Sequence, residues 1–179
     1  ALAIAALVYR SRAGAAFATA VASVGMTVPS LALLALLLIV FGLGVTPSVT
    51  MLAFYATLPI LTSAIVGLQA VPPALVEAAR GLGMPRWRVL ATVELPNAWP
   101  VILTGIRVST QLVVGVATVV AYVLGPGLGS LIFSGLARLG GAGALESALV
   151  GTVLVVAVAL VLDGLLVLLG RLTVSKGLR

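Results

Sequence analysis

The chain contains no cysteine and no histidine, and only four of its 179 residues are acidic. Without cysteine it can form no disulfide, thiol nucleophile or cysteine-ligated metal site, and without histidine it lacks the most common general base and metal ligand. Charged residues make up 8% of the chain, whereas a soluble domain carries about 25%. We therefore predict no enzymatic activity, no catalytic residue, no metal site and no cofactor of its own.

Apolar residues are abundant instead, at 62% of the chain, and the mean hydropathy is +1.33. Long, nearly uncharged stretches without alternating polar positions predict packed transmembrane helices rather than a β-barrel. The predicted fold class is an all-α polytopic membrane protein, with one transmembrane domain over residues 1–179. The net charge of +6 then indicates basic loops that orient the helices in a lipid bilayer, and not a nucleic-acid surface.

We predict about five spans, of which the first is incomplete. Crossing a bilayer takes ~20 helical residues, so Ala1–Tyr9 is either the end of a longer helix, which we favour, or an interfacial segment. Pro29 should kink or break the second span, and Pro59 lies near the middle of the third. The remaining spans are predicted at 16–43, 49–68, 98–123 and 144–169, with a short amphipathic or re-entrant helix at 128–137.

Clusters of glycine and proline predict the breaks between these elements. Gly42–Ser48, with Gly44 and Pro47, should form a short turn. Gly125–Gly129 should end the fourth span as a gate hinge or a plain turn. It is not predicted to bind a nucleotide, because no strand precedes it and no lysine follows it.

Eight of the ten basic residues fall in alternate loops, as five crossings require. They are Arg10, Arg12, Arg80, Arg86, Arg88, Arg171, Lys176 and Arg179. The loop between the second and third spans has no basic residue, and the loop between the fourth and fifth has only Arg138. Since Lys and Arg accumulate in short cytoplasmic loops, we expect the loop at 71–96 and the C-terminus to be cytoplasmic.

The loop at 71–96 is the one sizeable water-facing segment, and it holds five of the fourteen charged residues: Glu77, Arg80, Arg86, Arg88 and Glu94. Pro72 and Pro73 can start a helix at Ala74, and Gly81 and Gly83 should end it. A second helix at 85–93 should present Trp87 and Leu90 on one face. The pair at 95–96 should then redirect the chain into the fourth span.

The same segment has a recognisable spacing. A Glu77-Ala78-Ala79 triplet is followed by Gly83 and, nine residues later, by Val93-Glu94-Leu95-Pro96. This pattern resembles the EAA loop of ABC-importer permeases, with Val93 in place of isoleucine. The resemblance implies the type I (MetI-like) permease fold in a prokaryotic cell membrane. It also implies cytoplasmic ABC ATPase subunits that bind the ATP, a second permease subunit, identical or different, and an extracytoplasmic solute-binding protein.

In such permeases the loop is a coupling helix seated in a groove of the ATPase. By position, Glu77 would make polar contacts with the ATPase, Ala78 and Ala79 would permit close approach, and Gly83 would turn the chain. Arg80, Leu95 and Pro96 complete the predicted coupling residues. The arginines have an equal alternative, which is to hold the loop at anionic lipid headgroups, and Trp87 is a typical interface anchor.

Four further stretches resemble permeases for osmoprotectants such as glycine betaine, choline or carnitine. They are 27–34, 58–61, 94–107 and 125–133. A permease for methionine, sulfonate or nitrate is the alternative within the same superfamily. An ion-coupled secondary transporter, for which a deep acidic residue such as Asp163 would be needed, and a structural or channel subunit without an ATPase are the alternatives outside it.

Two charged residues are predicted inside the membrane. Arg107 and Asp163 should lie roughly 12 to 16 Å from the cytoplasmic ends of their spans. Either they approach each other or each lines a wet cavity; alternatively, Arg107 extends to the interface and Asp163 is protonated. Tyr55 and Tyr122, with Phe54 and Trp99, are candidates for a cation-binding substrate path, although packing or interface anchoring would also explain them.

Overall fold

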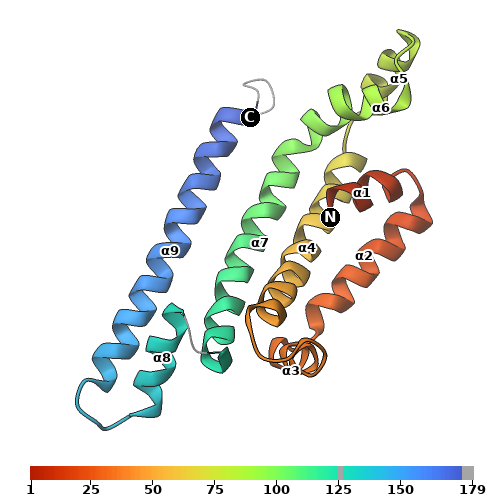
Figure 1. The fold of residues 1–179 in the computed structure, drawn as a ribbon. Coiled ribbons are helices and arrows are strands. Elements are labelled where there is room, and N and C mark those ends of the chain that lie inside the picture. The colour runs from red at the N-terminus through yellow and green to blue at the C-terminus, as the bar shows by residue number, and fades with distance from the viewer. Residues whose placement is uncertain (125–126, 175–179) are drawn as a thin grey trace. The chain divides into compact units, whose positions relative to one another are not determined.

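The computed structural model describes residues 1–124 and 127–174 (Figure 1). Every regular element in these ranges is a helix, which confirms the all-α prediction. The elements are α1 (Leu2–Val8), α2 (Arg12–Thr27), α3 (Ser30–Phe41), α4 (Val45–Gln69), α5 (Pro73–Gly81), α6 (Arg86–Val89), the π-helix η1 (Leu90–Glu94), α7 (Leu95–Leu124), α8 (Leu128–Ala137) and α9 (Ala144–Thr173). Four residues used in the predictions lie outside the described ranges: Gly125, Pro126, Lys176 and Arg179.

Within the described residues, three helical stretches are long and apolar enough to cross a membrane, and a fourth is counted if α2 and α3 form one broken span. The break is the one predicted at Pro29. Helix α2 ends at Thr27, and Pro29 adopts an extended ψ of 128° before α3 starts. The break occurs here because proline lacks the N–H that would continue the helix.

The chain forms two compact units. The first unit contains Ala1–Met26, Thr57–Ser109 and Leu166–Arg179, and the second contains Thr27–Ala56 and Thr110–Leu165. Helices α4, α7 and α9 contribute residues to both. The single domain over 1–179 stays a prediction.

In the first unit, glycines let α4 and α7 approach closely. A Cβ atom at Gly105 would lie 2.4 Å from the Ser63 Cβ, and one at Gly67 would lie 3.0 Å from the Ala98 carbonyl oxygen. Ile65 and Ile102 are fully buried in the same unit. Small residues at such contacts are typical of helix pairs in membranes, where close packing replaces the hydrophobic driving force.

In the second unit, α8 occupies the predicted range 128–137 and packs beside the start of α9 (Figure 1). A Cβ atom at Gly135 would come within 2.6 Å of the Ala144 carbonyl oxygen, and one at Gly151 within 2.8 Å of the Ile132 side chain. Gly127, with φ +141°, precedes α8. The short helix therefore forms a hairpin with α9.

The turn before the third span is shorter than predicted. Gly42 and Gly44 both adopt positive φ and form it, and α4 starts at Val45 rather than at Val49. Pro47 belongs to the first turn of α4, where its missing N–H would have no partner within the helix. Pro59 is inside α4, as expected.

The helix is not interrupted at Leu95–Pro96, where the sequence predicts a change of direction. Helix α6 passes directly into η1 and η1 into α7, so that residues 86–123 count as one helical stretch. In η1 the Leu95 N–H donates to the Leu90 carbonyl, five residues earlier. We attribute the continuity to this wider turn. Pro96 has no N–H to donate, and π-type adjustments let a helix continue past such a residue.

Candidate functional site

Helix α5 carries the Glu77-Ala78-Ala79 triplet and ends as predicted. Pro73 occupies its first turn, and Gly81 is its last residue. Beyond it Gly83, with φ +78°, donates its N–H to the Arg80 carbonyl at 2.8 Å. This left-handed conformation favours glycine because a Cβ would be strained there, and it turns the chain toward α6.

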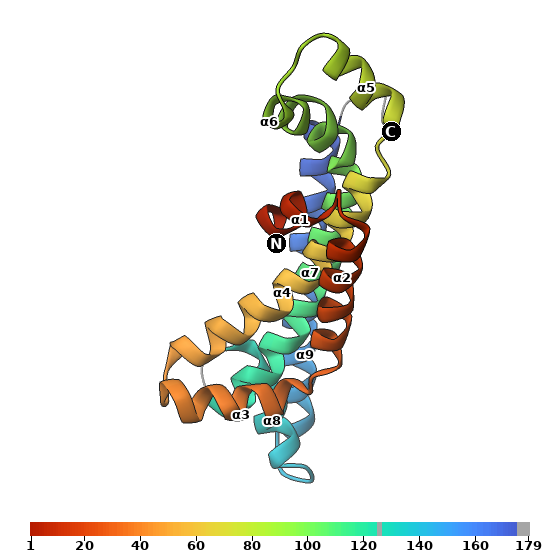
Figure 2. The same ribbon diagram turned by 90° about the vertical axis from the view of Figure 1, so that its right-hand side faces the viewer.

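Helices α5 and α6 and the turn between them, residues 73–89, stand together (Figure 2), and we call them the coupling knob after the role that the sequence predicts for them. Two of its residues, Ala79 and Val89, are buried. Trp87 is 66% exposed, Leu90 is half-buried, and the Arg88 guanidinium lies 5.5 Å from the Trp87 ring centroid. That Trp87 and Leu90 share one face stays a prediction. The exposed side chains of the knob combine apolar and charged groups: Leu75, Glu77, Arg80, Leu82, Arg86, Trp87 and Arg88.

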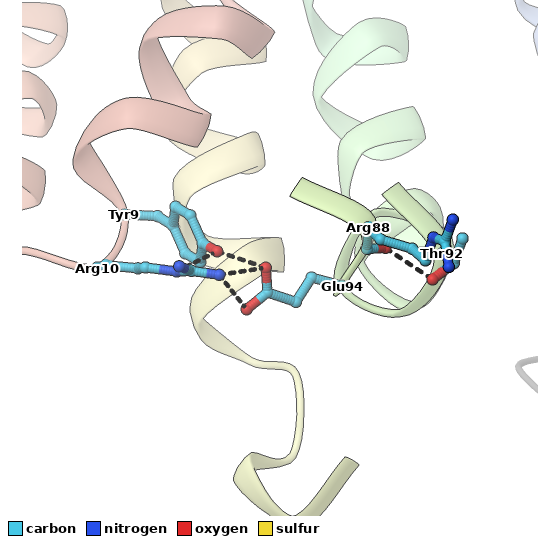
Figure 3. Close-up of polar contacts among 5 residues, drawn as sticks. All are labelled: Tyr9, Arg10, Arg88, Thr92 and Glu94. Atoms are coloured by element: carbon cyan, nitrogen blue, oxygen red, sulfur yellow. Dashed lines mark hydrogen bonds and ion pairs between the residues drawn. The ribbon is translucent and has the colours of Figure 1, made fainter. Parts of the chain in front are cut away.

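Glu94 was predicted to face water, and this prediction is wrong. Its residue exposure is 4%, and its carboxylate accepts three hydrogen bonds from two side chains (Figure 3). Arg10 Nη2 lies 3.1 Å from Oε2 and 3.3 Å from Oε1, and the Tyr9 hydroxyl donates to Oε2. Burial is possible because the partly exposed Arg10 neutralises the charge and the tyrosine satisfies a remaining lone pair.

The cluster also ties together segments that are far apart in sequence. Arg10 Nε donates to the Tyr9 hydroxyl at 2.6 Å, and Gln69 Nε2 donates to the Tyr9 carbonyl at 3.0 Å. The connection between α1 and α2, the end of α4 and the π-helix below the coupling knob are therefore joined by polar contacts. We call Tyr9, Arg10, Gln69 and Glu94 the base cluster.

Tyr9 lies outside the helices that are long enough to span a membrane. Burial, together with the hydrogen bond to Glu94 and its negative charge, raises the pKa of Tyr9 to about 12. A tyrosine is already protonated at neutral pH, and the raised pKa extends the pH range in which the phenol donates to the carboxylate.

The two predicted intramembrane charges belong to different units. Arg107, in α7, is half-buried and lines a groove in the first unit. Asp163, in α9, has its Oδ1 3.5 Å from Gln111 Nε2 in the second unit. Their mutual pairing stays a prediction.

The aromatic candidates have individual packing roles. The hydroxyl of buried Tyr55 donates to the Val28 carbonyl at the break before α3, and its ring packs edge-on to Phe54. Exposed Tyr122 lies 4.4 Å from the Phe133 ring, between centroids, and Trp99 Nε1 donates to the Thr173 hydroxyl at 2.9 Å. A substrate path past Tyr55 and Tyr122 stays a prediction.

The second unit also contains an apolar cavity of about 710 Å³. Its polar side chains are Ser48 and Thr118, and the Thr118 hydroxyl donates to the Val114 carbonyl at 2.9 Å. Among the described residues that line it, none is charged or aromatic. This lining lacks the groups that recognise a quaternary ammonium ion.

Comparison with known proteins gives a consistent result. The sequence profile described as "Binding-protein-dependent transport system inner membrane component" matches residues 1–174. An osmoprotectant import permease protein of Salmonella typhimurium is 41% identical over 149 residues, covering 83% of this chain and 61% of the relative.

Two further relatives carry related names. A carnitine transport permease protein of Listeria monocytogenes is 43% identical and covers 73% of this chain and 60% of the relative. A glycine betaine/carnitine/choline transport system permease protein of Bacillus subtilis is 36% identical, and the match covers 95% of this chain and 76% of the relative. The chain thus spans about 60% of the length of the Salmonella and Listeria proteins.

Replacing Glu94 by alanine should lower the free energy of unfolding by about 2 kcal/mol, because the Tyr9 and Arg10 donors lose their acceptor inside the protein. Glu94→Gln should lower it less, since the amide oxygen can still accept from Tyr9. The midpoint of thermal unfolding in detergent at neutral pH measures the change. The matched control is Glu77→Ala, which removes an exposed acid and should leave the midpoint nearly unchanged. Equal midpoints for both alanine variants would contradict the importance of the base cluster.

Proposed function

Since this chain belongs to the family of binding-protein-dependent transport system inner membrane components, we propose that it is the permease subunit of an ATP-driven importer of osmoprotectants. Glycine betaine, carnitine and choline are the proposed substrates, and the names of the relatives support this class. In the proposal, the chain itself performs no chemistry and binds no cofactor. ATP is hydrolysed by a separate cytoplasmic ATPase.

The observation that carries the proposal is the display of the EAA pattern on the exposed part of α5. Glu77 and Ala78 are exposed, while Ala79 is buried against the rest of the coupling knob. Exposed Leu82 and Trp87 add apolar area beside these charges. A short helix with small, charged and apolar side chains on its free surface suits docking into a groove of a protein partner.

In this proposal, movement imposed on the coupling knob reaches the membrane helices by two routes. The first is the uninterrupted helix through α6, η1 and α7. The second is the base cluster, in which Glu94 holds Arg10 next to the start of α2. Both routes pass through the same π-helix, so α2 and α7 would respond together to closure of the ATPase.

The proposed assembly contains cytoplasmic ABC ATPase subunits, a second permease subunit, identical or different, and an extracytoplasmic solute-binding protein. The chain would be a multi-pass protein of a prokaryotic cell membrane, with the coupling knob and the C-terminus in the cytoplasm. Basic residues on the knob support this orientation, because Arg80, Arg86 and Arg88 are all exposed and short basic loops remain cytoplasmic.

Glu77→Lys and Gly83→Pro should each reduce the amount of ABC ATPase that co-purifies with this chain from host membranes. The first variant reverses a charge on α5, and the second cannot adopt the positive φ of the turn or donate its N–H to Arg80. The ratio of ATPase to permease in the purified material measures the effect.

Matched controls separate this effect from general damage. Glu146→Lys reverses an acid at the start of α9, and Gly81→Ala replaces a glycine with open space around it. Both should retain the ATPase. Unchanged ATPase binding and uptake in Glu77→Lys and Gly83→Pro would overturn the coupling role.

Cysteine labelling tests the orientation, because the natural chain has no cysteine to interfere. A cysteine at Arg86 should react with an impermeant maleimide only after the cells are opened. A cysteine at Arg138, between α8 and α9, should react on intact cells. The opposite pattern would place the coupling knob outside the cell and exclude contact with a cytoplasmic ATPase.

Cells that express the assembled transporter should accumulate labelled glycine betaine, carnitine or choline when ATP is present. Uptake should survive the collapse of ion gradients, since ATP hydrolysis rather than ion flow supplies the free energy. Excess unlabelled methionine, sulfonate or nitrate should not compete. If one of these compounds competes, the proposed substrate is wrong. If uptake stops when the ion gradients collapse although ATP is still present, an ion-coupled transporter is favoured instead.

A further inference from the structure

A groove of about 310 Å³ runs between α7 and α9 in the first unit, lined by residues within 100–107 and 166–174. Trp99 and Thr173 join the two helices at one end through their hydrogen bond of 2.9 Å. Gly170 leaves the groove open, because its missing side chain exposes the space beside Leu103, whose Cδ1 lies 3.6 Å from the position of a Cβ.

Two of the nine lining residues are arginines, Arg107 and Arg171, and none of the nine is acidic. The hydroxyl of Thr104, a third polar lining residue, donates to the Pro100 carbonyl at 3.2 Å. Both arginines also have an interaction within the protein. A guanidinium has five N–H donors in a planar fork, so it can serve such a partner and still bind a phosphate oxygen.

The contacts between the helices also place the two arginines along the groove. Thr173 is level with Trp99, and Gly170 is level with Leu103, so in this antiparallel pair Arg171 is level with residue 102. The Cα of Arg107 is then five residues, or about 7.5 Å, further from the ends of the helices. The two positive charges lie at different levels along the groove.

The surroundings of these charges are apolar. Leu103, Leu166, Val167 and Val174 line the groove. A soluble anion would contact the arginines but leave this apolar surface in place. A molecule with an anionic head and long hydrocarbon chains would use both.

We propose that the groove between α7 and α9 binds an anionic phospholipid, with its phosphate between Arg107 and Arg171 and an acyl chain along α9. Basic grooves between transmembrane helices select such headgroups because the guanidinium groups pair with the phosphate where the bilayer excludes most water. The site is separate from the coupling knob, and it does not depend on which solute the protein transports.

The test compares lipids bound to the full chain after purification from vesicles of equal parts phosphatidylglycerol and phosphatidylcholine with the same palmitoyl and oleoyl chains. Native mass spectrometry should show phosphatidylglycerol retained in preference to phosphatidylcholine. Arg107→Gln and Arg171→Gln should each reduce that preference about tenfold, as expected for one charge-assisted hydrogen bond. Arg138→Gln removes the same charge outside the groove and should retain the preference.

Three results would each overturn the proposal. They are equal retention of the two lipids by the unaltered chain, an unchanged preference in both groove variants, and complete displacement of phosphatidylglycerol by inorganic phosphate at millimolar concentration. The last would identify a site for a free anion. If Arg107→Gln fails to fold, Arg171→Gln decides the question, because Arg171 is exposed in the last turn of α9.

Discussion

Glu94 carries a charge that the protein excludes from water, and the elements around it are arranged to satisfy that charge. A carboxylate buried to this extent is strongly unfavourable unless donors surround it. Arg10 and Tyr9 therefore have to stay at the base of the coupling knob, which fixes where α2 starts. Gln69 extends the same constraint to the end of α4 through the Tyr9 carbonyl.

The coupling knob and the membrane helices satisfy different requirements. The knob has little core beyond Ala79 and Val89, and it depends on local devices such as the proline at the start of α5 and the positive φ of Gly83. The helices below it depend on close approach at glycines, as between Gly105 and Ser63. An exposed knob on a tightly packed base suits the transmission of movement between a soluble partner and a bilayer.

Features that follow from local chemistry could be predicted from the sequence. The break at Pro29, the end of α5 at Gly81 and the short helix α8 each depend on a proline, a glycine or a short apolar run. The burial of Glu94 could not be predicted in this way, because Arg10 is 84 residues away in sequence. The sequence offered one indication of this burial, which is the position of Glu94 next to the start of an apolar span. The contact of Tyr55 with the Val28 carbonyl and the continuity of η1 into α7 likewise depend on neighbours in space or on hydrogen-bond register, which composition does not report.

The π-helix lies between Gly83 and Pro96, so it affects how many residues the chain has between these two positions. A deletion of one residue within Leu90–Glu94 would let an ordinary α-turn form there, since the wide turn accommodates one residue more than an α-turn. The helices on either side would then keep nearly the same facing, because the turn would lose its extra residue and its extra width together. The same deletion in the α-helical part of α7 would instead rotate everything before it by about 100° around the helix axis, which is the angle per residue of an α-helix. The wide turn is therefore a place where the chain can lose a residue without turning Arg80 and Trp87 to a different side of the molecule.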